Sequence, residues 1–314
     1  MNNLQQKKDF DVIIIGGGAA GLSAALWCDD LKLTALLVES NAELGGQLLW
    51  THNPIKNHLG VEAKNGREMR DRFVRQIEKR KFTLKLSSEI REIDFKKKIV
   101  SLETGENFTT KALIIATGIR RRKLNVEGEE EFKNKGIIES GKRDRNSIKN
   151  KRAAIVGGGD AALENALILA DAAAKVWLIH RGKNFSARAE FVEQVLKHPK
   201  IEILTESVVR KLSGSEKLEA IELENSQTKK TFKLLINALL IRIGIEPNTE
   251  IFHGKIDLDD EGFIKINSLC QTSVKDVFAI GDVANPVAPT ISGATGMGAT
   301  AAKAIYAVEE RRTE

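Results

Sequence analysis

Two glycine-rich turns, 141 residues apart, constrain the fold of this 314-residue chain more than any other feature. The first follows a buried strand expected at 12–15, spans Gly-Gly-Gly-Ala-Ala-Gly at 16–21, and opens a helix expected to run through Trp27. A second strand, expected at 35–38, leads into Glu39. Such a strand–turn–helix–strand unit is typical of dinucleotide binding, because the glycines let a pyrophosphate approach the backbone and the helix N-terminus offers free N–H groups.

A second copy of this unit repeats the first without a gap. Expected strands at 153–156 and 176–179 flank a Gly-Gly-Gly-Asp-Ala-Ala turn at 157–162 and a helix expected at 163–170. In both copies the ribose position lies 23 residues after the first glycine, and in the second copy it is occupied by His180. Two copies with matched spacing favour two dinucleotide sites over two ordinary glycine-rich turns.

The two copies differ at the ribose position. The carboxylate of Glu39 suits free ribose hydroxyls, as in FAD or NAD. His180 and Arg181 would suit a 2′-phosphate, as in NADP, and Lys183 and Arg188 could add positive charge. The alternative is that these basic residues form a solvated loop.

Three later segments tie the first copy to FAD. Gly-Gly-Gln-Leu at 45–48 is expected to form a loop over the pyrophosphate, and an expected strand within 112–118 ends in Thr-Gly. Another strand within 277–282 ends in Gly-Asp, where Asp282 would accept a hydrogen bond from a ribityl hydroxyl. A helix of small residues is expected at about 290–308, and the dipole at its N-terminus would stabilise a reduced, anionic flavin.

With two further motifs, the chain resembles the low-molecular-weight thioredoxin-reductase family of pyridine nucleotide–disulfide oxidoreductases over essentially its whole length. The motif Gly-x-x-Pro-Asn-Thr occurs at 244–249, and the flavin-side asparagine of the family is matched by Asn57. The resemblance implies an α/β fold with two Rossmann-like, three-layer ββα dinucleotide-binding domains. It places a NAD(P)H domain at 120–247 inside an FAD domain at 1–119 and 248–314, and it implies a homodimer.

The expected cofactor contacts follow from these motifs and from the resemblance. Those for FAD are Gly16, Gly18, Ala19, Ala20, Gly21, Glu39, Ser40, Gly45, Gly46, Gln47, Leu48, Asn57, Ala116, Thr117, Gly118, Gly281, Asp282, Thr290 and Ile291. Those for NADPH, NADH or another dinucleotide are Gly157, Gly159, Asp160, Ala161, His180, Arg181, Lys183, Ile243 and Gly244.

The redox segment of the family, Cys-Ala-Thr-Cys-Asp, falls here on Ser-Gly-Lys-Arg-Asp. Ser140 and Arg143 replace the two cysteines, and only the aspartate, Asp144, remains. The chain has two cysteines in all, Cys28 and Cys270, which are expected to be buried structural thiols. Without the cysteine pair no internal disulfide can carry electrons, so no catalytic residue is assigned.

Two other family features are altered. The Arg-Gln-Ala that starts the last helix corresponds to Pro289, Thr290 and Ile291, with the proline expected at the helix start. The NADP signature His-Arg-Arg-x-x-x-Arg keeps one of its arginines in register, Arg181. The choice between NADH and NADPH therefore stays open.

The chain carries 49 lysines and arginines against 43 acidic residues, a net charge of +6. This excess is too modest to favour nucleic acid as a partner. Basic residues gather at 120–123, the expected domain hinge, and at 142–152. Either these runs are solvated faces or the second is a docking site for an acidic electron-carrier protein, with salt-sensitive association.

Other classes of site are not expected. The two cysteines lie 242 positions apart, which excludes a cysteine zinc site and fits a reducing compartment, the cytoplasm. The five histidines lack metal-ligand spacing, so no metal is expected. The two long uncharged stretches, 12–28 and 283–302, are too interrupted by glycine or proline for a membrane span.

The favoured hypothesis is an FAD-dependent NAD(P)H oxidoreductase that passes electrons from the flavin directly to an external acceptor, such as a ferredoxin-, flavodoxin- or redoxin-like protein. One alternative is a disulfide reductase whose partners supply every thiol. Another is a flavin- or nucleotide-binding protein without reductase activity, with a second dinucleotide such as FAD in the NAD(P)H site.

Overall fold

The computed structural model describes residues 8–313, which form two compact units. The first unit comprises the described residues up to Arg120 and those from Glu246 onward, and the second comprises Arg121–Ile245. The chain passes between the units along β7 (Ile119–Arg121) and β16 (Ile245–Pro247), which pair with each other. The assignment of FAD to the first unit and of a nicotinamide nucleotide to the second remains a prediction.

The first unit is built on a seven-stranded sheet. Its strands are β1 (Lys8–Ile15), β2 (Ala35–Val38), β3 (Thr83–Lys85), β4 (Ile90–Asp94), β5 (Ile99–Leu102), β6 (Asn107–Ile115) and β17 (Val277–Ala279). They lie in the order β3-β2-β1-β6-β5-β4, with β17 beside the carboxyl half of β6. The β4–β5 and β5–β6 pairs are antiparallel, and the other pairs are parallel.

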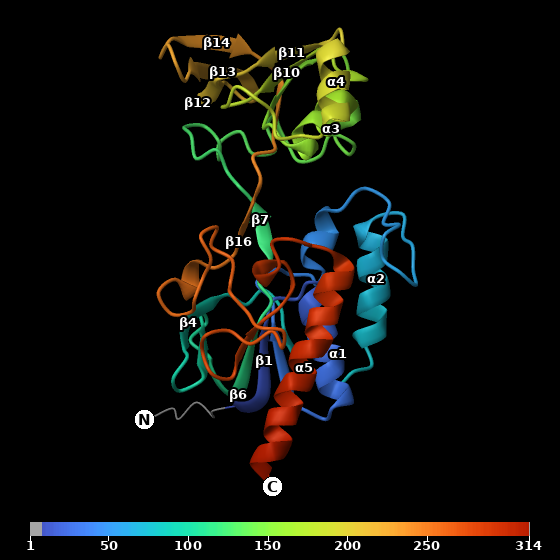
Figure 1. The fold of residues 1–314 in the computed structure, drawn as a ribbon, viewed down its shortest axis with the longest axis vertical. Coiled ribbons are helices and arrows are strands. Elements are labelled where there is room, and N and C mark those ends of the chain that lie inside the picture. Colours follow the sequence, from blue (N-terminus) through green and yellow to red (C-terminus); the bar gives the residue numbers. More distant parts are fainter. Residues whose placement is uncertain (1–7, 314) are drawn as a thin grey trace. The chain divides into compact units, whose positions relative to one another are not determined.

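Both faces of this sheet are covered. The helices α1 (Ala19–Asp30), α2 (Gly66–Ile77) and α5 (Ile291–Thr313) lie together beside β1 (Figure 1). The remaining elements are the 3-10 turns η1 (Gly46–Trp50), η3 (Glu250–Phe252) and η4 (Gly281–Ala284). Val12 and Ile14 of β1 pack into the core on the helix side, whereas Ile13 and Ile15 pack into the core on the opposite side. Burial on both faces explains the uninterrupted apolar run of this strand.

The second unit repeats the architecture on a parallel sheet with the order β11-β10-β9-β15-β8. Its strands are β8 (Ile137–Ile138), β9 (Arg152–Val156), β10 (Lys175–Ile179), β11 (Ile201–Leu204) and β15 (Ala238–Ile241). Around it lie η2 (Arg145–Ile148), α3 (Asp160–Ala170), α4 (Ala189–Lys197) and an antiparallel sheet of β12 (Ser207–Gly214), β13 (Leu218–Asn225) and β14 (Thr231–Leu235). The parallel sheet contributes to two hydrophobic cores. Residues of α3 and α4 pack with it in one core, and residues of β12 and β13 pack with it in the other.

The predicted elements need two corrections at helix ends. The helix expected at 163–170 begins at Asp160, because Gly159 is its N-cap and the turn leads straight into the first helical residue. The last helix begins at Ile291 rather than at the proline, because the hydroxyl of Thr290 accepts a hydrogen bond from the backbone N–H of Gly293 at 3.1 Å and caps the helix. Pro289 therefore precedes the helix instead of starting it.

Small residues let α5 approach α1 closely. The hydroxyl of Ser23 donates a 2.7 Å hydrogen bond to the carbonyl oxygen of Thr295. A Cβ added to Gly298 would lie 2.7 Å from the carbonyl oxygen of Ala20 and 2.8 Å from Cβ of Ser23. The helix pair therefore depends on the missing side chain at this position.

We predict that Gly298→Ala lowers the free energy of unfolding by about 1–3 kcal/mol, because the added methyl group forces α1 and α5 apart. Gly296 of the same helix is the matched control, since a Cβ there meets no atom within 4 Å. Gly296→Ala should raise the free energy of unfolding by about 0.5–1 kcal/mol through helix propensity. Urea denaturation of both variants measures the difference, and equal stabilities would contradict the packing argument.

Candidate functional site

The first glycine turn connects β1 to α1, and two of its glycines are required by the protein itself. Gly16 has a φ of +108°, and a Cβ there would collide with the carbonyl group of Ala116. A Cβ on Gly21 would collide with the carbonyl oxygen of Gly16, so this glycine allows the helix to pack against the strand. These two positions explain the fold of the turn.

Gly18 has no such requirement. Its φ is −77°, which any residue adopts, and the nearest atom to an added Cβ is Cα of Gly46 at 3.9 Å. Gly18 is also the N-cap of α1, so no N-cap side chain accepts a hydrogen bond from the first N–H groups of this helix. The turn therefore leaves open backbone beside free N–H groups, which is the arrangement that a pyrophosphate requires.

The loop at 45–48 lies against this turn. The backbone N–H of Gly45 donates to the carbonyl oxygen of Gly17 at 2.9 Å. The side-chain amide of Gln47 donates to the carbonyl oxygen of Ile119 at 2.8 Å, and Leu48 is buried. The loop is thus held at the edge of the open backbone.

Glu39 stands at the carboxyl end of β2 and is buried, with 6% of its surface exposed. One carboxylate oxygen accepts a 2.7 Å hydrogen bond from the backbone N–H of Gly17. The other accepts from the backbone and the side-chain amide of Asn41, at 2.8 and 2.6 Å, and from the hydroxyl of Ser40 at 3.2 Å. The oxygen bonded to Gly17 keeps a further lone pair, which a ribose hydroxyl can use.

Asp282 lies in η4, next to Gly281, which packs against Ala20 of α1. Its carboxylate has no hydrogen-bond donor among residues 8–313. Burial raises the pKa of Asp282 above its ordinary value. A half-buried acceptor without a partner favours a ligand hydroxyl at this place, because such a group is costly to leave unsatisfied.

The other flavin-side predictions cluster around the same strand ends. The hydroxyl of Thr117 donates to the carbonyl oxygen of Asn248 at 2.8 Å, and the amide of Asn248 donates back to the carbonyl oxygen of Thr117 at 2.7 Å. Asn57 is exposed, and its neighbour His58 bonds to Ser292 of α5 at 3.0 Å. These contacts hold Thr117 just past the carboxyl end of β6 and the segment around His58 beside the start of α5.

The second turn has the same construction. Gly157, at a φ of +152°, would collide with the carbonyl oxygen of Arg242 if it carried a Cβ. The ring of His180 covers Gly158, as Glu39 covers its counterpart in the first unit. Gly159 is again the open position, since the nearest atom to an added Cβ is the hydroxyl oxygen of Ser186 at 3.7 Å.

The basic residues beyond β10 contribute less positive charge than the sequence predicted. Nε2 of His180 lies 2.9 Å from the carbonyl oxygen of Asn184. The guanidinium of Arg188 pairs with Asp160 at 2.8 Å and with Glu190 at 3.1 Å, so its charge is offset. Arg181 and Lys183 are exposed and form no ion pair within the described residues.

Ile243 and Gly244 follow β15, as Thr117 and Gly118 follow β6 in the first unit. Arg242 precedes them, and its backbone N–H donates to the carbonyl oxygen of Val156 at 2.8 Å. Sequence reasoning missed Arg242, although its place just past a buried strand and beside a glycine turn is a signal that could have identified it.

The segment at 140–144 is organised by Asp144. One carboxylate oxygen accepts hydrogen bonds from the backbone N–H groups of Glu139 and Ser140 at 2.9 and 3.1 Å. The guanidinium of Arg143 donates to both carboxylate oxygens, at 2.7 and 2.9 Å. Burial opposes ionisation, but the hydrogen bonds from Arg143, Ser140 and Glu139 outweigh it and lower the pKa of Asp144 below its ordinary value. Asp144 is therefore an ionised anchor of this loop.

Both cysteines are buried free thiols in the core of the first unit. Burial raises the pKa of Cys28 to about 12 and that of Cys270 to about 11. A thiol that stays protonated at neutral pH is a poor nucleophile. Neither residue is suited to thiol–disulfide chemistry in the folded protein.

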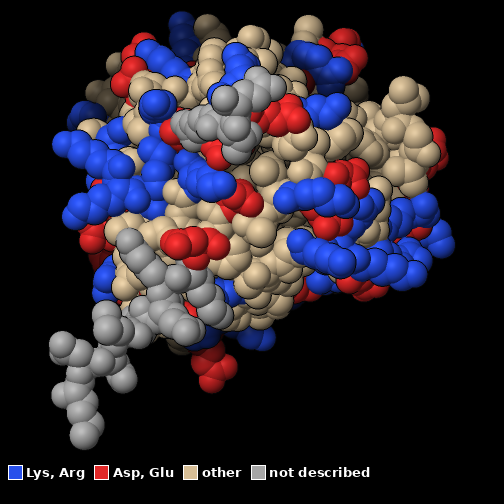
Figure 2. Space-filling model, turned by 90° about the horizontal axis from the view of Figure 1, so that it is seen from below, with Lys and Arg blue, Asp and Glu red and all other residues tan. Residues whose placement is uncertain are grey.

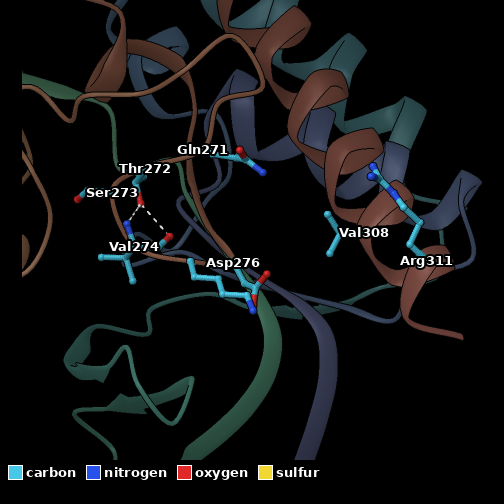
Figure 3. Close-up of a pocket in the computed structure, with 8 residues that line it drawn as sticks. Gln271, Thr272, Ser273, Val274, Asp276, Val308 and Arg311 are labelled. Carbon is cyan, nitrogen blue, oxygen red and sulfur yellow. Dashed lines mark hydrogen bonds between the residues drawn. The ribbon is translucent and has the colours of Figure 1, made fainter.

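A cavity of about 540 Å³ lies elsewhere in the first unit (Figure 3). It is lined by the residues at 271–276 and by Val308 and Arg311 of α5. These loop residues precede β17, whereas Gly281 and Asp282 follow it. The cavity is therefore at the amino end of this strand, and ligands of open parallel sheets bind at carboxyl ends.

The basic segment at 142–152 is mostly exposed. Arg145 pairs with Asp171 at 3.3 Å, while Lys142, Lys149 and Lys151 form no ion pair within the described part of the chain. Figure 2 shows a different face of the molecule, on which lysines and arginines lie among aspartates and glutamates. Within residues 8–313 no helix has the length and apolar character of a membrane crossing, and no cluster of side chains offers a metal site.

Comparison with known proteins identifies the family. Residues 10–302 match the family described as pyridine nucleotide-disulphide oxidoreductase. The chain belongs to this family. Its members of the thioredoxin-reductase type use FAD and NAD(P)H, and the chain is a thioredoxin-reductase-like flavoprotein oxidoreductase.

Relatives match over nearly the full length. The thioredoxin reductase of Rickettsia felis is 33% identical over 298 residues, which is 93% of this chain and 95% of that protein. The 34.2 kDa protein in the rubredoxin operon of Clostridium pasteurianum is 30% identical over 300 residues, covering 95% and 97% of the two chains. The crystal structure of Lactococcus lactis thioredoxin reductase superimposes with a TM-score of 0.80 at 29% identity, covering 96% and 99%. The predicted fold class, two Rossmann-like dinucleotide-binding domains, is confirmed.

The anchoring of the 140–144 loop predicts a pH-dependent stability. Asp144→Asn should lower the free energy of unfolding by about 1–2 kcal/mol at pH 7, because it removes the charge that receives the hydrogen bonds. The folded pKa lies below the ordinary value of 3.8, so this stabilisation is present above pH 3.8 and is lost as the pH falls through the folded pKa. Urea denaturation at several pH values measures it, and a difference that grows on acidification would contradict the assignment.

Proposed function

We propose that this protein is an FAD-dependent NAD(P)H oxidoreductase that delivers electrons to an external acceptor without an internal disulfide. FAD supplies the hydride-accepting and electron-donating chemistry when bound. FAD contacts fall to the first unit and NAD(P)H contacts to the second. A homodimer belongs to the proposal as an implication of the family resemblance.

The flavin side is supported by the fit between the residues and the cofactor. The fold does not require a glycine at position 18, and the missing side chain there leaves the backbone accessible to a ligand. The carboxylate of Glu39 is held in place by the N–H of Gly17. Asp282 offers an acceptor without a protein donor. These three features match a pyrophosphate, a ribose and a polyhydroxylated chain in turn.

The nicotinamide side is supported by the matched construction of the second turn. Gly159 is open in the same way as Gly18, and α3 begins directly behind it. Arg181 and Lys183 are the charges available for a 2′-phosphate. The pairing of Arg188 with Asp160 weakens the case for NADPH over NADH.

The observation that carries the proposed electron path is the chemistry of the 140–144 loop and of the two cysteines. Ser140 and Arg143 stand where the family has its redox cysteines, and the thiols that the chain possesses are buried and protonated. The acceptor must then be an external molecule. The clostridial relative is named for a rubredoxin operon.

An acidic carrier protein is the proposed acceptor. Lys142, Lys149 and Lys151 are exposed without ion pairs, so their charge is available to a partner. Charges of this kind act mainly on the association rate and are screened by salt.

Matched substitutions in the two turns test the cofactor assignment. Gly159→Ala should leave the FAD content unchanged and weaken NAD(P)H binding at least tenfold, because the methyl group occupies the place of the pyrophosphate while meeting no protein atom closer than 3.7 Å. Gly18→Ala should instead reduce the FAD content. Anaerobic titration with NADPH and NADH, followed by flavin absorbance, provides the readout.

Wild-type protein that retains its flavin but is bleached by neither nucleotide would contradict the reductase. The occupant of the second site would then have to be another dinucleotide. Loss of FAD from Gly159→Ala would contradict the division of the two sites.

The docking surface is tested by charge reversal. Lys142→Glu combined with Lys149→Glu should raise the KM for a [2Fe–2S] ferredoxin or a flavodoxin several-fold at low salt and leave the KM for NAD(P)H unchanged. Lys233→Glu on β14 is the control, since this exposed lysine lies in another sheet of the same unit. Equal effects of the two reversals would contradict the proposed surface.

A further inference from the structure

Two arginines from distant parts of the sequence converge on one oxygen atom in the second unit. Nη1 of Arg121, the last residue of β7, donates to the carbonyl oxygen of Glu139 at 2.5 Å. Nη2 of Arg242, which follows β15, donates to the same oxygen at 2.7 Å. β8 and β15 are parallel neighbours, and Glu139 and Arg242 both lie just past their carboxyl ends.

The charges of this cluster do not balance. Arg143 is taken by Asp144, and the carboxylate of Glu139 lies 3.4 Å from Arg121. Arg242 forms no ion pair with any carboxylate within residues 8–313, and its hydrogen bonds go to two neutral carbonyl groups. One positive charge is left over beside a second arginine. The side chain of Arg121 is 43% exposed, so water screens part of the repulsion, and an anion between the two guanidinium groups would remove the rest.

The two guanidinium groups also have unused donors. The protein hydrogen bonds of Arg121 use Nη1 alone, and those of Arg242 use Nη1 and Nη2. Within the described chain, Nε and Nη2 of Arg121 and Nε of Arg242 have no acceptor. Burial and the nearby positive charge of Arg121 lower the pKa of Arg242 to about 10. Burial also lowers the pKa of Arg121 below its ordinary value.

We propose that Arg121 and Arg242 form a binding site for one oxyanion group, a phosphate or a carboxylate, at the carboxyl edge of the second parallel sheet. The planar guanidinium fork matches the paired oxygens of both groups. This site does not depend on the proposed electron transfer, and binding can be measured without turnover.

The position of the arginine pair separates it from the pyrophosphate. The glycine turn follows β9, whereas the shared oxygen of Glu139 follows β8, two strands further along the sheet. The backbone of Arg242 adjoins the turn, because a Cβ on Gly157 would lie 2.2 Å from its carbonyl oxygen, but its guanidinium reaches away to the oxygen of Glu139. Two strand spacings separate β9 from β8, which is roughly 10 Å. The ribose position at His180 lies on the other side of the turn, past β10. The proposed oxyanion is therefore neither the pyrophosphate nor the ribose phosphate of the dinucleotide, and its site lies beside Ile243 and Gly244, which are expected to contact the dinucleotide.

Inorganic phosphate and acetate are the probes. Thermal unfolding of the FAD-loaded full chain is followed against each anion, with chloride holding the ionic strength constant. Ligand that binds only the folded state raises the Tm in proportion to its occupancy. We expect stabilisation by at least one of the two anions beyond chloride, and the anion whose stabilisation is lost in Arg242→Gln identifies the group that the site prefers.

Substitutions locate the binding. Arg242→Gln should weaken the anion affinity at least tenfold, and Arg242→Lys should weaken it less, because it keeps the charge and loses the fork. Arg210→Gln, whose arginine pairs with Glu224 on the antiparallel sheet, is the control for surface charge. It should bind the anion like the wild type, and Arg121→Gln replaces Arg242→Gln if the latter fails to fold.

Three results would overturn the site. They are no stabilisation beyond chloride, equal stabilisation of wild type and Arg242→Gln, or complete loss of the anion effect when NADPH or NADP saturates the protein. The last result would assign the anion to the dinucleotide site.

Discussion

The close approach of backbone to backbone at the end of the first strand of each unit is the constraint on which the structure depends. Gly16 and Gly157 have positive φ angles and face a carbonyl group of the neighbouring strand, where no side chain fits. That contact sets the direction of the following helix, and the helix in turn sets where its free N–H groups lie. The fold and the nucleotide sites thus come from the same few atoms, once in each unit.

The third glycine of each turn is free of that constraint, so its presence needs an explanation other than the fold. Gly18 and Gly159 have ordinary φ angles and open space around the missing side chain. A protein gains stability when such a glycine becomes alanine, because glycine costs more conformational entropy on folding. The glycines at these two positions therefore indicate a ligand that contacts the backbone directly. The unpartnered carboxylate of Asp282 indicates the same for the flavin side.

In the proposed function, the loop at 140–144 stands where the family has its redox cysteines. Asp144 collects two backbone N–H groups and the guanidinium of Arg143, so the loop is held by charge and hydrogen bonds. Beside it, Arg121 and Arg242 gather around the carbonyl oxygen of Glu139. The segment is charged, and in the proposed function it suits anions and acidic partners.

The sequence predicted the features that repeat or that depend on local pattern. The strand at 35–38 has the predicted limits, and those expected at 153–156 and 176–179 each begin one residue earlier, because continuous apolar runs report burial on both faces. The strand expected within 277–282 ends at Ala279, before Gly281 and Asp282. It could not predict contacts that tertiary structure creates between distant residues. The pairing of Arg188 with Asp160 and the meeting of Arg121 with Arg242 depend on loop paths and on the β8–β15 register. The start of α5 was misplaced because the cap by Thr290 outweighed the preference of proline for a first turn.

The most direct test of the account is an electron count. The FAD-loaded protein is titrated with dithionite under anaerobic conditions, and its absorbance is followed to full reduction. A protein without an internal disulfide takes up two electrons per bound FAD and shows no long-wavelength thiolate–flavin charge-transfer band. Uptake of four electrons, or the appearance of that band, would contradict the account, because it would reveal a redox-active thiol pair in contact with the flavin.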